Sequence, residues 1–200
     1  MARRGLAISP NAAFWTVMLE LSACSAYFVF YVQSRRAVWA AKRAADVKSG
    51  DAVQLLKVID GDELSVRGKS GPFVVRMLGI KSFKPSTNDP GLSQVGMACV
   101  AAIKRILQDK KITVEFTTHR RDKAGRLLAY LHAGGRDVGQ LLLQQGHTIV
   151  FTRYPFGREK TYLGIEQEAR TRKLGLWANA RADMRATALK ATWETQRGDD

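Results

Sequence analysis

Hydrophobic and polar residues alternate through the middle of the chain, in short runs that glycine, proline and charged residues separate. Alternation with a period of two is typical of strands that bury one face. Asp60-Gly61 predicts the turn between the first two strands, and residues 68–72 predict the next hairpin loop. The five strands are predicted at about Val53–Val58, Glu63–Arg67, Phe73–Ile80, Lys111–Phe116 and Arg126–His132.

Three further segments are predicted to be helices, over Leu92–Leu107, Val138–Gln145 and Arg158–Lys173. The first has apolar residues at helical spacing. The second is bounded by Asp137 as an N-cap and by Gly146 as a stop. Five short strands with intervening helices are compatible with an α+β fold built on an OB-type five-stranded barrel.

An alanine-rich stretch, Ala180–Gln196, predicts a C-terminal helix. Its few large apolar residues are Met184, Leu189 and Trp193, so it is too polar to be a second membrane span. A helix of this kind beyond the barrel either docks on a partner or forms a loosely held tail, and both interpretations stay open.

The strongest apolar stretch lies near the N-terminus, over residues 11–33. About 20 apolar residues span a bilayer, and the aromatic residues at both ends suit the headgroup level. Leu21-Ser22-Ala23-Cys24 resembles a lipoprotein cleavage box, and the arginine-containing N-terminus resembles a mitochondrial presequence. Because the apolar run continues past Cys24, we expect a retained single-pass anchor.

Glu20 interrupts this apolar segment near its middle. Acidic residues in lipid usually face a partner or a cavity, so Glu20 is predicted to contact a partner helix. The alternative is that it is tolerated in neutral form, at a cost of up to a few kcal/mol. Basic residues on both sides, heavier on the C-terminal side, favour placing the folded domain on the cytoplasmic or matrix side.

These segments predict a basic N-terminus (1–10), a transmembrane helix (11–33), a basic helical linker (34–50), the barrel domain (51–178) and a helical tail (179–200). The whole chain carries 32 Lys and Arg against 18 Asp and Glu, a net charge of +14. Such a surplus attracts polyanions, either nucleic acid or anionic lipid. The two cysteines and three histidines are scattered, which argues against a transition-metal site.

Three motifs follow one another in the predicted barrel: Val58-Ile59-Asp60-Gly61-Asp62-Glu63-Leu64, an apolar strand carrying Arg76, and Asp122–Tyr130 carrying Arg126. With the ending Lys-Leu-Gly-Leu-Trp, they resemble the staphylococcal nuclease (thermonuclease) family over roughly Asp51 to Trp177. The resemblance implies the OB barrel and Ca²⁺-dependent hydrolysis of DNA or RNA. It implies Asp62 as the first metal ligand, and Arg76 and Arg126 as a phosphate clamp.

Two positions depart from the family pattern. Lys81 stands where the resemblance places the second metal carboxylate, and Lys84 stands where it places the general-base glutamate. Ca²⁺ requires oxygen ligands, and an ammonium group repels a cation by about 4 kcal/mol at 4 Å and an effective dielectric of 20. A lost base costs on the order of 10²–10⁴ in rate. We therefore expect a pseudo-nuclease without a cofactor, with Ca²⁺ as the alternative.

Each remaining site residue also has a simpler interpretation. Asp62 is typical of a hairpin turn, and Arg76 in an apolar strand is as compatible with a salt bridge to Asp62 as with phosphate binding. Arg126 is compatible with a solvated strand start. Lys81 and Lys84 are either surface charge or, with the two arginines, a cationic pocket that holds phosphate without a metal.

Three functional hypotheses remain. The first is a membrane-anchored, inactive barrel serving as a structural or assembly subunit of a larger membrane complex, expected in the mitochondrial inner membrane, with the bacterial inner membrane as the alternative. The second is a membrane-tethered module for nucleic acid or phosphate, in which Tyr154, Phe156 and Tyr162 either stack on bases or pack in the core. The third is a working Ca²⁺ nuclease that uses other acids, namely Asp60, Glu63 or Asp89.

Overall fold

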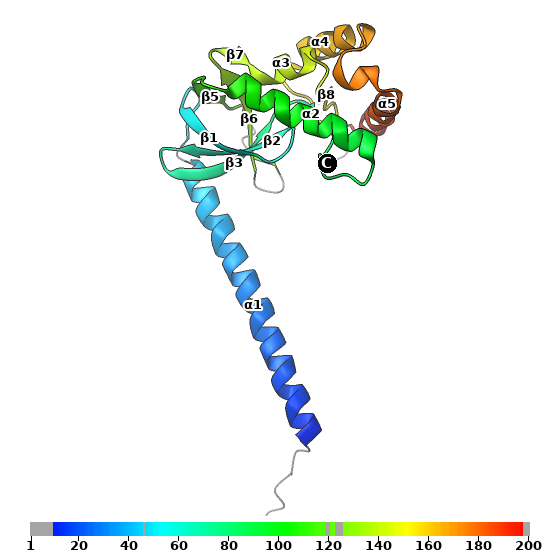
Figure 1. Ribbon diagram of the computed structural model, residues 1–200. Coiled ribbons are helices and arrows are strands. Elements are labelled where there is room, and N and C mark those ends of the chain that lie inside the picture. Colours follow the sequence, from blue (N-terminus) through cyan, green and yellow to red (C-terminus); the bar gives the residue numbers. More distant parts are fainter. Residues whose placement is uncertain (1–9, 46, 119–120, 123–125, 198–200) are drawn as a thin grey trace, which may run out of the picture. The chain divides into compact units, whose positions relative to one another are not determined.

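The computed structural model of the chain describes residues 10–45, 47–118, 121–122 and 126–197. The predicted basic segment before Pro10 and the turn residues 123–125 lie outside this description. The chain divides into two compact units, Met1–Lys42 and Arg43–Asp200. Figure 1 shows the long N-terminal helix of the first unit and the barrel with its helices in the second.

Helix α1 (Pro10–Ala45) is continuous over 36 residues. No glycine or proline follows Pro10 before residue 50. The sequence therefore contains no helix-breaking residue at position 33, where the predicted membrane segment ends, and the helix continues past it. Its window Phe14–Val32, of 19 residues, is long and apolar enough to cross a membrane. At 1.5 Å per residue it is about 29 Å long, close to the thickness of a bilayer core.

Five strands form the barrel: β1 (Ala52–Val58), β2 (Glu63–Gly68), β3 (Gly71–Met77), β5 (Ile112–Glu115) and β6 (Leu127–Ala133). Neighbours in the order β3-β2-β1-β5-β6 are antiparallel, and a parallel contact between β3 and β6 closes the ring. This arrangement confirms the predicted five-stranded α+β barrel, with small shifts at the strand ends.

Three two-residue strands complete the domain: β4 (Ile80–Lys81), β7 (Arg136–Asp137) and β8 (Ile149–Val150). The predicted third strand ran on to Ile80, whereas β3 ends at Met77. The chain turns at Gly79, which has a φ of +77°, and a Cβ there would lie 2.3 Å from the ring of Phe156. Glycine is therefore required, and the turn aims β4 at β8, with which it pairs.

The helices are α2 (Pro90–Leu107), α3 (Val138–Gln144), α4 (Glu159–Thr171), a short 3₁₀ turn (Gly175–Ala178) and α5 (Ala180–Thr195). Asp137 caps α3 as predicted, accepting a hydrogen bond from Gln140 N at 3.1 Å. Asp89 caps α2 in the same way. Each cap satisfies backbone N–H groups that have no partner inside the helix.

The C-terminal helix α5 packs on its own domain. Ala182, Ala186 and Trp193 are buried in an apolar cluster that also contains Trp177 and Phe83, and α5 contacts α2 beside the barrel (Figure 1). Ion pairs secure it along its length, joining Arg181 to Asp89, Asp183 to Arg170 and Lys190 to Glu166. These contacts hold α5 on its own domain and argue against a loosely held tail. Docking of α5 on an external partner stays a prediction.

Candidate functional site

The buried carboxylate of Asp62 is the centre of the candidate site. Asp62 follows the turn between β1 and β2, where its backbone N–H donates to Asp60 Oδ1 at 3.0 Å. The turn lies so close to α2 that a Cβ at Gly61 would be 2.5 Å from Cys99 Sγ. The Asp62 side chain is fully buried, so its oxygens depend on partners from the protein.

Two cations and one serine supply those partners. Lys81 Nζ lies 3.0 Å from both Asp62 Oδ1 and Oδ2, and Arg76 Nη1 lies 2.9 Å from Oδ2. Ser82 donates to Oδ1 from its backbone N–H at 3.1 Å and from Oγ at 2.8 Å. The Arg76–Asp62 salt bridge that the sequence left open is therefore present.

A second carboxylate, Glu63, lies between the two arginines of the predicted phosphate clamp. Glu63 and Arg76 are cross-strand partners in the β2–β3 register, and Arg76 Nη1 is 3.2 Å from Glu63 Oε1. Arg126 precedes β6, which runs parallel beside β3, so Arg126 reaches the same Glu63 oxygen. Arg126 Nε also binds Asp122 at 2.7 Å.

We call these six residues the ion-pair cluster: Asp62, Glu63, Arg76, Lys81, Asp122 and Arg126. Three negative charges face three positive ones, so the cluster is formally neutral. Burial by itself lowers the pKa of Arg126, but the carboxylates of Asp122 and Glu63 raise it above its ordinary value. The cluster is thus a set of paired charges, and three of the four residues of the predicted cationic pocket belong to it.

The donors around Asp62 do not suit Ca²⁺. This ion takes six to eight oxygen ligands at 2.3–2.6 Å, whereas the Asp62 oxygens are held by two cationic groups and a serine. Among the described residues, no three His, Cys, Asp or Glu side chains come together as a metal site. Asp62 is the one predicted metal ligand, and it lacks the second carboxylate that the resemblance implies.

The other acids proposed for a working nuclease have separate contacts. Asp89 caps α2 and pairs with Arg181, and Asp60 stabilises the turn before Asp62. Glu63 is held by its two arginines. Lys84, at the predicted general-base position, is exposed beyond β4 and does not belong to the ion-pair cluster.

The family model of the staphylococcal nuclease homologues matches residues 74–179, just over half of the chain. The chain belongs to this family. In its nuclease-family barrel, Arg76 lies on β3 and Arg126 lies directly before β6.

Bacterial nucleases are among the similar proteins. The SPbeta prophage-derived endonuclease YokF of Bacillus subtilis is 32% identical over 133 residues, which are 63% of this chain and 44% of that protein. Endonuclease YncB of the same organism is 31% identical over 135 residues, 64% of this chain and 62% of YncB. Thermonuclease of Staphylococcus intermedius is 27% identical over 142 residues, which are 68% of this chain and 81% of that protein. The chain therefore spans about half of the first two relatives.

The three aromatic residues considered for base stacking have different surroundings in the nuclease-family domain. Tyr162 is fully buried and donates to Asp137; burial and the nearby carboxylate raise its pKa. Phe156 packs against Gly79. Tyr154 is 40% exposed, so it alone of the three presents a large free surface, and core packing explains the other two.

Sequence reasoning missed a second group of charged residues, which surrounds β5, β6 and β7. Arg158 pairs with both Glu115 and Asp137, and its guanidinium lies 4.0 Å from the centre of the Tyr130 ring. His132 Nε2 lies 2.7 Å from Glu115. Burial tends to raise the pKa of Glu115, but hydrogen bonds from Arg158 and His132 lower it below its ordinary value. These residues lie on β5, β6, β7 and before α4, so no local motif could have indicated their meeting.

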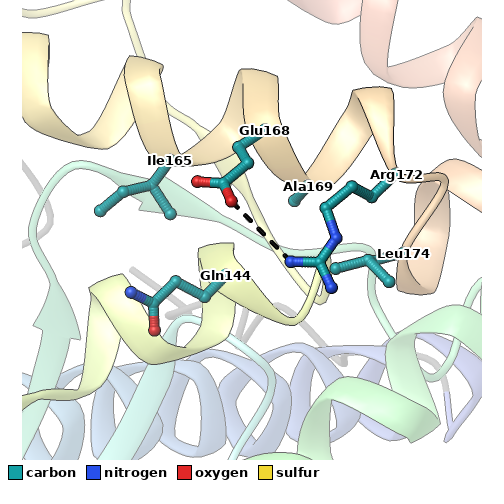
Figure 2. Close-up of a pocket in the computed structure, with 6 residues that line it drawn as sticks. All are labelled: Gln144, Ile165, Glu168, Ala169, Arg172 and Leu174. Atoms are coloured by element: carbon teal, nitrogen blue, oxygen red, sulfur yellow. Dashed lines mark ion pairs between the residues drawn. The ribbon is translucent and has the colours of Figure 1, made fainter.

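A small pocket of about 250 Å³ lies away from the ion-pair cluster. Gln144 of α3, Ile165 and Glu168 of α4 and Arg172 just after α4 are among the residues that line it, and Glu168 and Arg172 form an ion pair at 3.8 Å (Figure 2). Both members of this pair are largely exposed. Exposed pairs one helical turn apart stabilise a helix slightly, and the pocket offers no further charged group.

Proposed function

We propose that this chain is a membrane-anchored nuclease-family domain that does not hydrolyse nucleic acid with Ca²⁺, and that it serves as a structural or assembly subunit of a membrane complex. The main support for the proposed inactivity is the position of Lys81, whose ammonium group lies 3.0 Å from both oxygens of Asp62.

Electrostatics oppose a divalent cation at this position. A Ca²⁺ ion 4 Å from the ammonium would be repelled by about 8 kcal/mol at an effective dielectric of 20, twice the value for two single charges. Lys81 would have to leave Asp62 for the metal to bind. Its departure would still not supply the second carboxylate ligand or a base, because the base position holds Lys84.

The arginines support the same proposal. A phosphate group would compete with Glu63 for Arg76 and Arg126, because the Glu63 carboxylate already lies against both guanidinium groups. Charge-assisted hydrogen bonds of this kind are among the stronger ones in proteins. The glutamate thus acts as an internal anion at the position where substrate phosphate would bind.

A polyanion-binding role is the second candidate, and the charge distribution favours it. The ion-pair cluster is neutral, so the whole surplus of +14 comes from residues outside it. Those charges would attract nucleic acid or anionic lipid without using the former active site. Retention of single-stranded DNA that falls steeply with salt would support this role over the structural one.

The anchor rests on the 19-residue apolar window of α1. A span of this length suits either expected location, the mitochondrial or the bacterial inner membrane. Fractionation followed by extraction with alkaline carbonate tests the anchor, since a spanning helix stays in the pellet. Migration on a native gel far above the 22.2 kDa of one chain would support membership of a larger complex.

A nuclease assay tests the proposal that the chain does not hydrolyse nucleic acid with Ca²⁺. The full chain in mild detergent, incubated with single-stranded DNA and Ca²⁺, should produce no more cleavage than a blank. The matched variant Lys81→Asp/Lys84→Glu restores both missing acids and provides a comparison in the same scaffold. Hydrolysis by the wild type that requires Ca²⁺ and disappears on Arg76→Ala would overturn the proposal.

A further inference from the structure

Within the apolar window of helix α1, Glu20 shares one side of the helix with three other residues that carry hydroxyl groups, Thr16, Tyr27 and Tyr31. At about 100° per residue, seven residues lie within about 60° of Glu20 or at it, and we call them the Glu20 face: Thr16, Val17, Glu20, Ala23, Cys24, Tyr27 and Tyr31. Most large apolar residues of the window lie on the remaining sides. Thr16, Glu20, Tyr27 and Tyr31 therefore form a polar stripe, whereas Ser22 and Ser25 lie on the opposite side of the helix.

The Glu20 face extends along most of the window. Glu20 is three residues from the middle of Phe14–Val32, which is about 4.5 Å along the helix axis. Tyr27 and Tyr31 follow two and three turns later, with their rings stacked at a centroid distance of 6.3 Å. By contrast, the hydroxyl of Ser22, on another side, donates to Met18 O of the same helix at 2.8 Å.

Given the proposed membrane anchor, on which this inference rests, we infer that the Glu20 face binds the transmembrane helix of a different protein that carries a lysine or arginine at the same depth. Acidic side chains in a bilayer core are costly unless a partner or a cavity satisfies them. A cation at that depth would neutralise Glu20, and a helix packed on this side would also cover the small residues Ala23 and Cys24.

Charge complementarity excludes a second copy of this chain as the preferred occupant. The window Phe14–Val32 contains no Lys, Arg or His. A second copy packed in parallel would therefore bring a second carboxylate to Glu20 and no counter-ion, which is repulsive when both are ionised.

A defined probe tests the inference. The full chain in mild detergent micelles is titrated with a biotinylated polyleucine transmembrane peptide that has one central lysine, and the retained fraction is measured. The same peptide with leucine in place of lysine is the reference. Wild type should bind the lysine peptide about tenfold more tightly than the reference, the order of a strong interhelical polar contact, and Glu20→Gln should lose the preference.

The swap Met18→Glu/Glu20→Met is the matched control. It preserves the composition and moves the carboxylate by two residues, about 200° around the helix. The preference for the lysine peptide should therefore be lost, because the carboxylate no longer lies on the Glu20 face. Equal binding of both peptides by wild type, an unchanged preference after Glu20→Gln or after the swap, or self-association of the chain that requires Glu20 would each overturn the inference. Release of the chain by alkaline carbonate would instead show that the anchor itself fails.

Discussion

Replacing Lys81 with methionine is the most direct perturbation of the ion-pair cluster. The change keeps much of the side-chain volume and removes the ammonium that lies 3.0 Å from both Asp62 oxygens. Asp62 has no exposed surface, so water does not readily replace the lost donors. Arg76 and Ser82 remain in contact with it.

The structure sets the expected size of the effect. Removing one partner of a buried pair typically costs 3–5 kcal/mol of unfolding free energy, and a hydrogen bond to a charged group contributes about 1.5–3 kcal/mol. Because Arg76 still pairs with Asp62 and Lys81 is partly exposed, we expect about 2 kcal/mol for Lys81→Met. Asp62→Asn should cost about 3–5 kcal/mol, since it leaves two cations without their shared carboxylate.

The double variant measures the interaction itself. In Asp62→Asn/Lys81→Met the ammonium that Asp62→Asn deprives of its carboxylate is also gone, so the double change should cost about 1–2 kcal/mol less than the sum of the single changes. Urea unfolding of the full chain in mild detergent, followed by tryptophan fluorescence, provides the free energies because Trp177 and Trp193 are buried.

Lys84→Met serves as the control for this cycle. Lys84 is exposed, so its replacement should stay within about 0.5 kcal/mol. A Lys81→Met variant no less stable than Lys84→Met, or strictly additive costs in the cycle, would refute the reasoning that Lys81 acts as the counter-ion of Asp62.

Three further predictions concern other parts of the domain. Glu63→Gln removes the carboxylate from between the two arginines and should raise the affinity for inorganic phosphate by about tenfold in calorimetric titration; unchanged affinity would contradict the role of Glu63 as an internal anion. Burial, and to a smaller extent Arg105, lowers the pKa of His147, so the unfolded chain takes up the proton more readily. Thermal stability should therefore fall as pH drops below about 6.5. If the stability of His147→Gln falls equally steeply over the same pH range, protonation of His147 is not the cause. Trp193→Ala should cost about 3–5 kcal/mol of unfolding free energy because α5 is docked, whereas Met184→Ala, exposed on the same helix, should be nearly neutral; equal effects in urea unfolding would indicate a loose helix.

Much of the fold was predictable because its signals are local. The strand at Val53–Val58 and the cap at Asp137 depend on neighbouring residues, and both predictions are confirmed. The end of the third strand was misplaced because its apolar pattern runs on through Gly79, where the backbone turns against Phe156. That contact joins distant parts of the chain, and periodicity contains no information on it.

The candidate site was predictable in part. The motifs predicted that Asp62, Arg76 and Arg126 share one region, and the three residues do belong to one cluster; the prediction that Lys81 replaces a calcium-binding acid stays a prediction. They did not predict that Glu63 would lie between the arginines, since this depends on the β2–β3 register and on the closing contact with β6.

By itself, then, the sequence determined a 19-residue apolar window, the barrel strands, and the lysines at positions 81 and 84, where the family resemblance implies acids. Only the tertiary structure decided that Lys81 pairs with Asp62, that Glu63 pairs with both arginines, and that α5 packs on the barrel domain. The physical reason is one of range. Strand and helix patterns arise from neighbouring residues, whereas the partner of a charged side chain is set by the closure of the barrel, which brings together residues far apart in the chain.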